Sequence, residues 1–179
     1  MSDRSRWSNF EVKGQAVMSI VAAMSLIQSQ ALKILADRGI TPLEKDRWYP
    51  LDRALEVYKI IQTEIGPTTV KAVGRKIPEV AEFPPNITTI EDGFRSIDIA
   101  YRLHHRGLGD VGGYHYKSLG ERKGQMVCDN PYPCALDEGI LEAIGERFRP
   151  KGSLWVRVEH LAGSCRKSGA DSCTYNISW

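Results

Sequence analysis

Residues 112–134 are GGYHYKSLGERKGQMVCDNPYPC, and no other stretch of the chain constrains the architecture as strongly. Residues 114–119 and 125–128 resemble the two arms of a β-hairpin, and the GERKG segment at 120–124 supplies the turn between them. Asn130-Pro131-Tyr132-Pro133 then interrupts the strand, because proline has no amide hydrogen to donate to a neighbouring strand. The stretch therefore predicts a hairpin followed by a new element.

That new element is expected to be a helix over residues 134–148, where Leu136, Ile140 and Ile144 recur at steps of four. Apolar and polar side chains alternate after it, over 154–160 and again over 173–179, as in half-buried strands. Residues 112–179 are therefore predicted to form a β-β-α-β-β unit.

Upstream, residues 12–106 show the apolar periodicity of helices. We expect four of them, over residues 14–37, over 52–64, in a short segment between Pro67 and Pro78, and over 88–105. Separate runs of helices and strands are typical of α+β proteins. The prediction is one α+β domain over residues 1–179, with N-terminal helices packed on a mainly antiparallel sheet of about four strands with one inserted helix.

Composition limits the classes of function. The 179 residues are 42% hydrophobic and 26% charged, as in globular domains, and the net charge of +2 comes without a basic block. We therefore expect no direct nucleic-acid contact. Residues 1–10 lack the apolar core of a signal peptide, and polar side chains interrupt the apolar stretch at 16–35. The expectation is a cytoplasmic protein without a membrane contact.

Four cysteines are the residues most suggestive of chemistry. Cys128 and Cys134 flank one turn, and Cys165 and Cys173 flank another. In the reducing cytosol they are expected as thiols or thiolates, although two disulfides remain an alternative. Zinc requires three or four soft ligands at about 2.3 Å. We predict a structural zinc site made of the four cysteines, with His160 as a rival ligand.

Other interpretations of the cysteines stay open. Any of them can be a small buried hydrophobe, and Cys173 shares a strand face with apolar residues. Cys134 begins a helix, which favours a thiolate, so it could be the nucleophile of a small hydrolase or reductase with His160 as base. The four sulfurs could also hold an iron–sulfur cluster.

The segment from Gly163 to Tyr175, with Cys165, Gly169 and Cys173 followed by an aromatic strand, resembles the V4R (4-vinyl reductase) domain. Asn130–Cys134 and the residues just after it are similar to the segment that precedes this motif in that family. The resemblance covers residues 85–179 and extends only loosely to the N-terminal helices.

This resemblance implies an α+β small-molecule-binding module, similar in fold to subunits of a vesicle-tethering complex and often homodimeric. Such domains occur in aromatic sensors of bacterial transcription activators, so it implies signalling and transcription regulation. In those sensors cysteines and a glutamate hold a structural zinc. Cys165 and Cys173 match the cysteine pair, but Ala162 stands where the glutamate is expected.

A second group of residues suggests a ligand pocket. Aromatic rings with a few polar groups suit a planar hydrophobic ligand such as a phenol, a tetrapyrrole or a haem. His104 continues an apolar stripe, so it could be an axial haem ligand or a hydrogen-bond donor, although a cation at a helix C-terminus is also a common cap. The predicted ligand-binding residues are Tyr101, His104, His105, Tyr114 and Tyr116.

No catalytic motif accompanies these groups. Residues 107–112 (GLGDVG) have the spacing of a dinucleotide fingerprint, but they follow a helix and precede a strand, the reverse of the required order. The leading hypothesis is a sensory domain that binds a small hydrophobic or aromatic ligand beside a structural zinc. The alternatives are a haem or iron–sulfur sensor and a cysteine-dependent enzyme.

Overall fold

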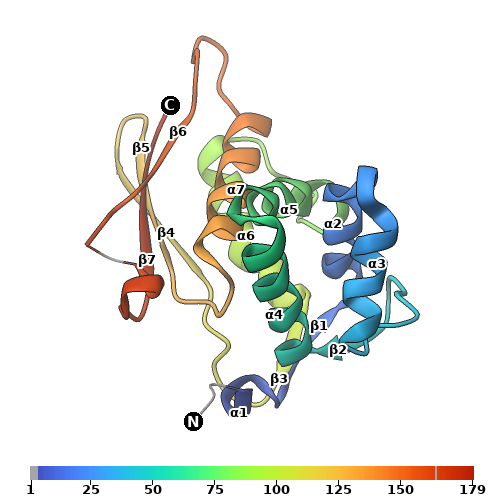
Figure 1. Ribbon diagram of the computed structural model, residues 1–179. Helices are drawn as coiled ribbons and strands as arrows, with labels where there is room; N and C mark the ends of the chain where they lie inside the picture. The colour runs from blue at the N-terminus through green and yellow to red at the C-terminus, as the bar shows by residue number, and fades with distance from the viewer. Residues whose placement is uncertain (1–3, 164) are drawn as a thin grey trace.

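The computed structural model describes residues 4–163 and 165–179. The C-terminal part forms a sheet, and helices α6 (Ile90–Leu103) and α7 (Cys134–Arg147) lie against it (Figure 1). Helices α2 (Gly14–Ala23) and α3 (Gln28–Asp37) lie on the far side of α6 and α7 from this sheet, and the N-terminal part also contains a second, smaller sheet. Helices α6 and α7 therefore lie between the C-terminal sheet and the N-terminal part of the molecule.

The larger sheet has four strands in the order β4-β5-β7-β6, and every neighbouring pair is antiparallel. On β7, residues Cys173, Tyr175 and Ile177 are buried and alternate with half-buried polar residues, as the sequence pattern requires. The α+β class and the inserted helix are confirmed. The strands are β4 (Tyr114–Gly120), β5 (Lys123–Cys128), β6 (Arg157–His160) and β7 (Cys173–Ser178).

The smaller sheet corrects the prediction that residues 12–106 contain only helices. Its strands are β1 (Phe10–Lys13), β2 (Trp48–Pro50) and β3 (His105–Gly107), in the antiparallel order β2-β1-β3. Each is three or four residues long, too short for alternation along one strand to be recognised in the sequence. Pairing of β1 with β3 places the segment just before α2 beside the segment that follows α6 and begins with His105.

The first predicted helix is broken. It consists of α2 (Gly14–Ala23), a 3-10 turn over Ser25–Ile27 and α3 (Gln28–Asp37), and the two helical parts are bent by 84°. Leu26 and Ile27 at the bend are 99% and 40% exposed, so the buried apolar face is interrupted there. Among the described residues, the bent pair alone meets the length and composition of a membrane span, and no single helix does.

The other helices lie close to their expected positions. Helix α5 runs through Pro78 for two further residues, whereas the sequence predicted that this proline would end it. Thr89 caps α6 by accepting a hydrogen bond from the Asp92 amide. The bounds are α1 (Arg4–Trp7), α4 (Leu51–Ile60) followed by a π turn over Ile61–Ile65, and α5 (Pro67–Val80).

Helices α5 and α7 approach each other backbone to backbone. A Cβ added to Gly139 would lie 2.1 Å from the Lys71 carbonyl oxygen, and one added to Gly74 would lie 2.2 Å from the Leu136 oxygen. The Lys71 ammonium pairs with Glu138 at 2.8 Å along the same contact. Both glycines are therefore required by the packing, which fixes the position of α7 and of Cys134 at its start.

Gly139→Ala should lower the free energy of unfolding by roughly 1–3 kcal/mol, because the added methyl must push two helix backbones apart. Alanine would otherwise favour the helix by about 1 kcal/mol. Urea denaturation followed by circular dichroism measures the change. Gly163→Ala is the control, because no described atom outside the adjacent residues lies within 4 Å of the added Cβ. Equal stabilities of the two variants would contradict this packing.

Candidate functional site

Three cysteines and one histidine converge at the end of the larger sheet. Cys134, His160, Cys165 and Cys173 each place one ligand atom within 4.8 Å of the others. They come from four segments: the first residue of α7, the last residue of β6, the loop after it, and the first residue of β7. Strand pairing between β6 and β7 and the docking of α7 therefore assemble the group.

The sulfur separations suit a tetrahedral ion. The Sγ of Cys134 lies 3.6 Å from that of Cys165 and 3.2 Å from that of Cys173. Ligands placed tetrahedrally at about 2.3 Å from zinc are roughly 3.8 Å apart. Modest adjustment of the cysteine side chains would bring the three sulfurs to that spacing.

His160, a member of this group, has a buried ring nitrogen without a hydrogen-bond partner among the described residues. This nitrogen is Nε2, and the ring stacks on Tyr175 with 4.5 Å between the centroids. A buried polar atom without a partner is costly, and a metal ion is one species that would satisfy it. The sequence named His160 only as a rival ligand, but the geometry places it within the group.

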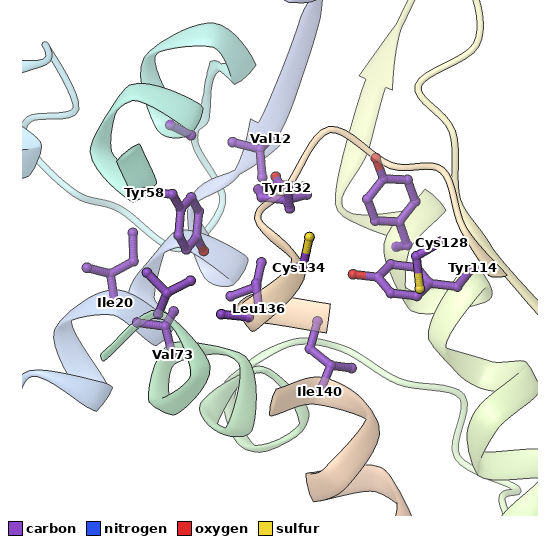
Figure 2. Close-up of a cluster of buried hydrophobic side chains, with 14 of the residues drawn as sticks. Val12, Ile20, Tyr58, Val73, Tyr114, Cys128, Tyr132, Cys134, Leu136 and Ile140 are labelled. Carbon is purple, nitrogen blue, oxygen red and sulfur yellow. The ribbon is translucent and has the colours of Figure 1, made fainter. Parts of the chain in front are cut away.

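Cys128 lies outside the group. It is fully buried and stands opposite Tyr114 on β4 and Cys173 on β7 in the strand register. Figure 2 shows Cys128 beside the Tyr114 ring and Cys134 at the start of α7. The predicted set of four cysteines is therefore not brought together, because the sulfur of Cys128 is not among the ligand atoms that lie within 4.8 Å of one another.

The surroundings oppose ionisation of the Cys134 thiol and favour ionisation of the Cys165 thiol. Burial raises the pKa of Cys134 to about 12, and the neighbouring Cys173 adds to the shift. Burial also acts to raise the pKa of Cys165, but hydrogen bonds from the Lys167 amide and from the other two thiols outweigh it and lower the pKa. A divalent cation reverses this balance, since it stabilises thiolates directly.

A buried polar network adjoins the group, and the sequence does not point to it. Asp137 is fully buried and accepts hydrogen bonds from the Tyr114 hydroxyl at 2.8 Å and from the Asn130 side chain at 3.1 Å. It also pairs with the Arg166 guanidinium. Burial raises the pKa of Asp137 even though Arg166 opposes the shift. An acid in the first turn of a helix usually serves the helix dipole, and nothing in the sequence marks this carboxylate as buried.

A cavity of about 50 Å³ lies between α6, α7 and the N-terminal helices. Four of the five predicted ligand-binding residues line it, and the fifth, Tyr116, stacks on Phe94 away from the cavity. Tyr58 and Tyr132 also line it, edge to face at 5.4 Å, and the sequence did not single them out. The four predicted residues in the lining are Tyr101, His104, His105 and Tyr114.

Both histidines in the lining are neutral and already bonded. Burial lowers the pKa of His105 to about 4 and also lowers that of His104. His105 Nδ1 lies 2.7 Å from the Tyr101 carbonyl, so it carries the hydrogen, and Nε2 accepts from the Tyr132 hydroxyl at 2.6 Å. His104 likewise donates to the Ala100 carbonyl and accepts from the Glu82 amide. Neither ring has a vacant lone pair.

Comparison with solved structures identifies the fold as that of H-NOX domains. An H-NOX protein from S. oneidensis in the Fe(II)NO state is 14% identical, with a TM-score of 0.65 over 93% of this chain and 98% of that one. A point mutant of T. tengcongensis H-NOX is 13% identical, with a TM-score of 0.65 over 91% and 94%. A Cs H-NOX mutant is 15% identical, with a TM-score of 0.66 over 93% and 95%.

No protein-family model and no curated protein matches the sequence. The resemblance to V4R domains is wrong, since the similar structures are H-NOX domains and none of those reported points to V4R. The motif that suggested V4R consists of two cysteines around the turn between β6 and β7, a local feature that different folds can share. The fold is shown by structural likeness at low identity, and chemistry has to be argued from this chain's own residues.

This likeness raises the question of whether the cavity of this chain fits a haem. One similar structure concerns haem redox potential and porphyrin distortion, and others carry Fe(II)NO or Fe(II)CO. The cavity in this chain is about 50 Å³, enough for a few water-sized groups, whereas cavities for larger ligands measure about 300–1,000 Å³. In the described part of the chain its lining holds no lysine or arginine to pair with haem propionates. The side chains present do not fit a haem.

The neutral His105 predicts a pH dependence of stability. The pKa of His105 in the folded chain, about 4, lies below the usual 6.5, so between these values the unfolded chain binds a proton at His105 and the folded chain does not. The folded state therefore has its full stability, as far as His105 is concerned, above pH 6.5, and it loses stability as the pH falls towards 4.

Between pH 6.5 and 4.5, wild type should lose on the order of 1–3 kcal/mol more stability than His105→Gln. Urea denaturation at each pH measures the difference. His115→Gln, at an exposed histidine on β4, is the control and should follow wild type. Parallel curves for wild type and His105→Gln would show that His105 is not buried in its neutral form.

Proposed function

We propose that this chain is a small-ligand sensory domain of the H-NOX fold in which Cys134, His160, Cys165 and Cys173 hold a structural zinc ion. The observation that carries the proposal is the convergence of four ligand atoms from four segments within 4.8 Å. Three sulfurs and one imidazole nitrogen form a common ligand set for structural zinc. The free Nε2 of His160 supports the same assignment.

A zinc ion at this place would supply positive charge and tie three elements together. The start of α7 is already fastened to β7 by the Tyr175 hydroxyl, which donates to the Cys134 carbonyl at 2.9 Å. The loop that carries Cys165 is held by its own turn, where the Ser168 and Ala170 amides donate to the Cys165 carbonyl, and by Arg166, which pairs with Asp137 on α7. Zinc would add a second link between this loop and α7.

The sensory part of the proposal rests on the cavity. Its walls come from α2, α4, α6 and α7, so a ligand there contacts both parts of the molecule. The lining is almost entirely apolar, and its histidines and tyrosines are uncharged. A small neutral, hydrophobic molecule suits these walls, and its entry would shift the helices relative to one another.

A haem-based gas sensor is the second candidate, and the likeness to H-NOX structures favours it over an iron–sulfur centre. His105 would be the axial ligand, since its Nε2 carries a lone pair directed at Tyr132 within the cavity lining. The small cavity and its lack of cations oppose this candidate. The same cavity could admit haem only if Tyr132 and Tyr58 moved out of it.

The cysteine-dependent enzyme has less support. Cys134 would need to be a thiolate, but burial raises its pKa to about 12 and only 6% of the residue is exposed. A thiol in that state is a poor nucleophile. The expectations of a homodimer, a cytoplasmic location and a role in transcription regulation stay predictions.

Purified protein should contain about one zinc ion per chain. Cys165→Ala and Cys173→Ala should each lose most of it, whereas Cys128→Ala should retain it, because only Cys128 lies outside the converging group. Elemental analysis after gel filtration measures the content, and circular dichroism checks that each variant folds.

His160→Ala provides the test of the fourth ligand, and its zinc should fall well below that of wild type. Loss of zinc from Cys128→Ala together with retention in His160→Ala would instead support the four-cysteine site predicted from the sequence. Zinc absent from wild type, with all four thiols reactive, would exclude the metal centre.

Protein produced in cells supplied with a haem precursor should show no Soret absorption band, because the cavity has neither the volume nor the cations for haem. The visible spectrum of the purified chain is the measurement. A Soret band that disappears in His105→Ala and persists in His115→Ala would establish the haem alternative.

A further inference from the structure

We propose that Arg166 is a positioning residue that couples the apolar cavity to the metal centre, through Asp137 and Tyr114. The inference rests on the proposed function, because it concerns how one part of that sensor affects the other. It adds a route by which a ligand in the cavity changes the affinity of the cluster for zinc.

Arg166 contacts the cluster at Cys173. Its backbone amide and its Nε each donate to the Cys173 Sγ at 3.4 Å. The guanidinium is thus the cation beside one of the ligand sulfurs. Donors placed around a ligand sulfur set its orientation and its charge, and removing such partners typically weakens metal binding about 10–100-fold.

The other side of the guanidinium is fixed in the interior. It donates to Asp137, which is fully buried, and to the Asn130 carbonyl. A buried carboxylate requires this partner, since an unpaired charge in the interior is strongly destabilising. The position of Arg166 therefore depends on where Asp137 directs its oxygens.

Asp137 is in turn bonded to the wall of the cavity. The Tyr114 hydroxyl donates to its Oδ1 at 2.8 Å, and the Tyr114 ring lines the cavity. Three side chains in direct contact thus connect the cavity to a ligand sulfur. Tyr101 offers a comparison on the same wall, because its hydroxyl donates to the Val111 carbonyl at 2.9 Å and takes no part in this connection.

A ligand that moves Tyr114 would weaken one of the bonds to Asp137. With one hydrogen bond fewer, the Asp137 carboxylate would attract the Arg166 guanidinium more strongly. Arg166 would then move towards Asp137, and its hydrogen bond to Cys173 would weaken. By linkage, zinc must change the affinity for that ligand by the same factor as the ligand changes the affinity for zinc. The simpler alternative is that Arg166 only neutralises Asp137, in which case its effect would be confined to stability.

Zinc affinity, measured by competition with a chromogenic chelator, distinguishes the two. Arg166→Gln should weaken zinc binding about 10–100-fold, and Arg166→Lys should weaken it less, because lysine keeps the charge but not the fork of donors. Arg157→Gln, which makes the same change at an exposed arginine on β6, is the control and should match wild type. In the cobalt-loaded protein, the thiolate-to-cobalt charge-transfer band should shift in Arg166→Gln and not in Arg157→Gln.

Tyr114→Phe tests the cavity end. It should weaken zinc binding about two- to fivefold, since it removes one neutral hydrogen bond to Asp137, whereas Tyr101→Phe should leave the affinity unchanged. Equal affinities of Tyr114→Phe and Tyr101→Phe would overturn the coupling. So would a cobalt spectrum in Arg166→Gln identical to that of wild type. Wild type without zinc would overturn the proposed function and the coupling with it, whereas zinc-loaded wild type with an unresponsive series would overturn the coupling alone.

Discussion

The buried carboxylate of Asp137 imposes the constraint on which the rest of the site depends. A charge in the interior is tolerated only when its oxygens are fully bonded, and here Tyr114, Asn130 and Arg166 provide the partners. These partners come from β4, from the turn before α7 and from the loop between β6 and β7. Because Asp137 lies one helical turn after Cys134, the hydrogen bonds that satisfy the Asp137 carboxylate also fix the position of Cys134 in the cysteine–histidine cluster.

The close packing of α5 on α7 acts in the same direction. Gly74 and Gly139 allow the two backbones to touch, which leaves α7 little freedom to slide or rotate. The N-terminal part, which contributes α5, thereby holds the element that carries Cys134. The apolar cavity and the cysteine–histidine cluster both include residues of α7, so neither can change shape without affecting this helix.

The H-NOX fold and the chemistry of this chain are separate findings. The likeness at 13–16% identity describes how helices and strands are arranged. In this chain Tyr58 and Tyr132 meet edge to face in the lining, and the cavity that remains is small and uncharged. Similar solved structures carry Fe(II)NO or Fe(II)CO, whereas in this chain aromatic side chains line the small cavity.

The sequence alone determined the β-β-α-β-β order, the inserted helix and the two turns that carry cysteines, because periodicity and turn residues act over a few neighbouring positions. It could not recognise strands of three or four residues, the bend in the first helix or the H-NOX arrangement. Nor could it choose between Cys128 and His160. They lie on the two strands that flank β7, and only the strand register and the docking of α7 decided which one faces Cys134. Such choices depend on contacts between residues far apart in the chain, which local sequence patterns do not encode.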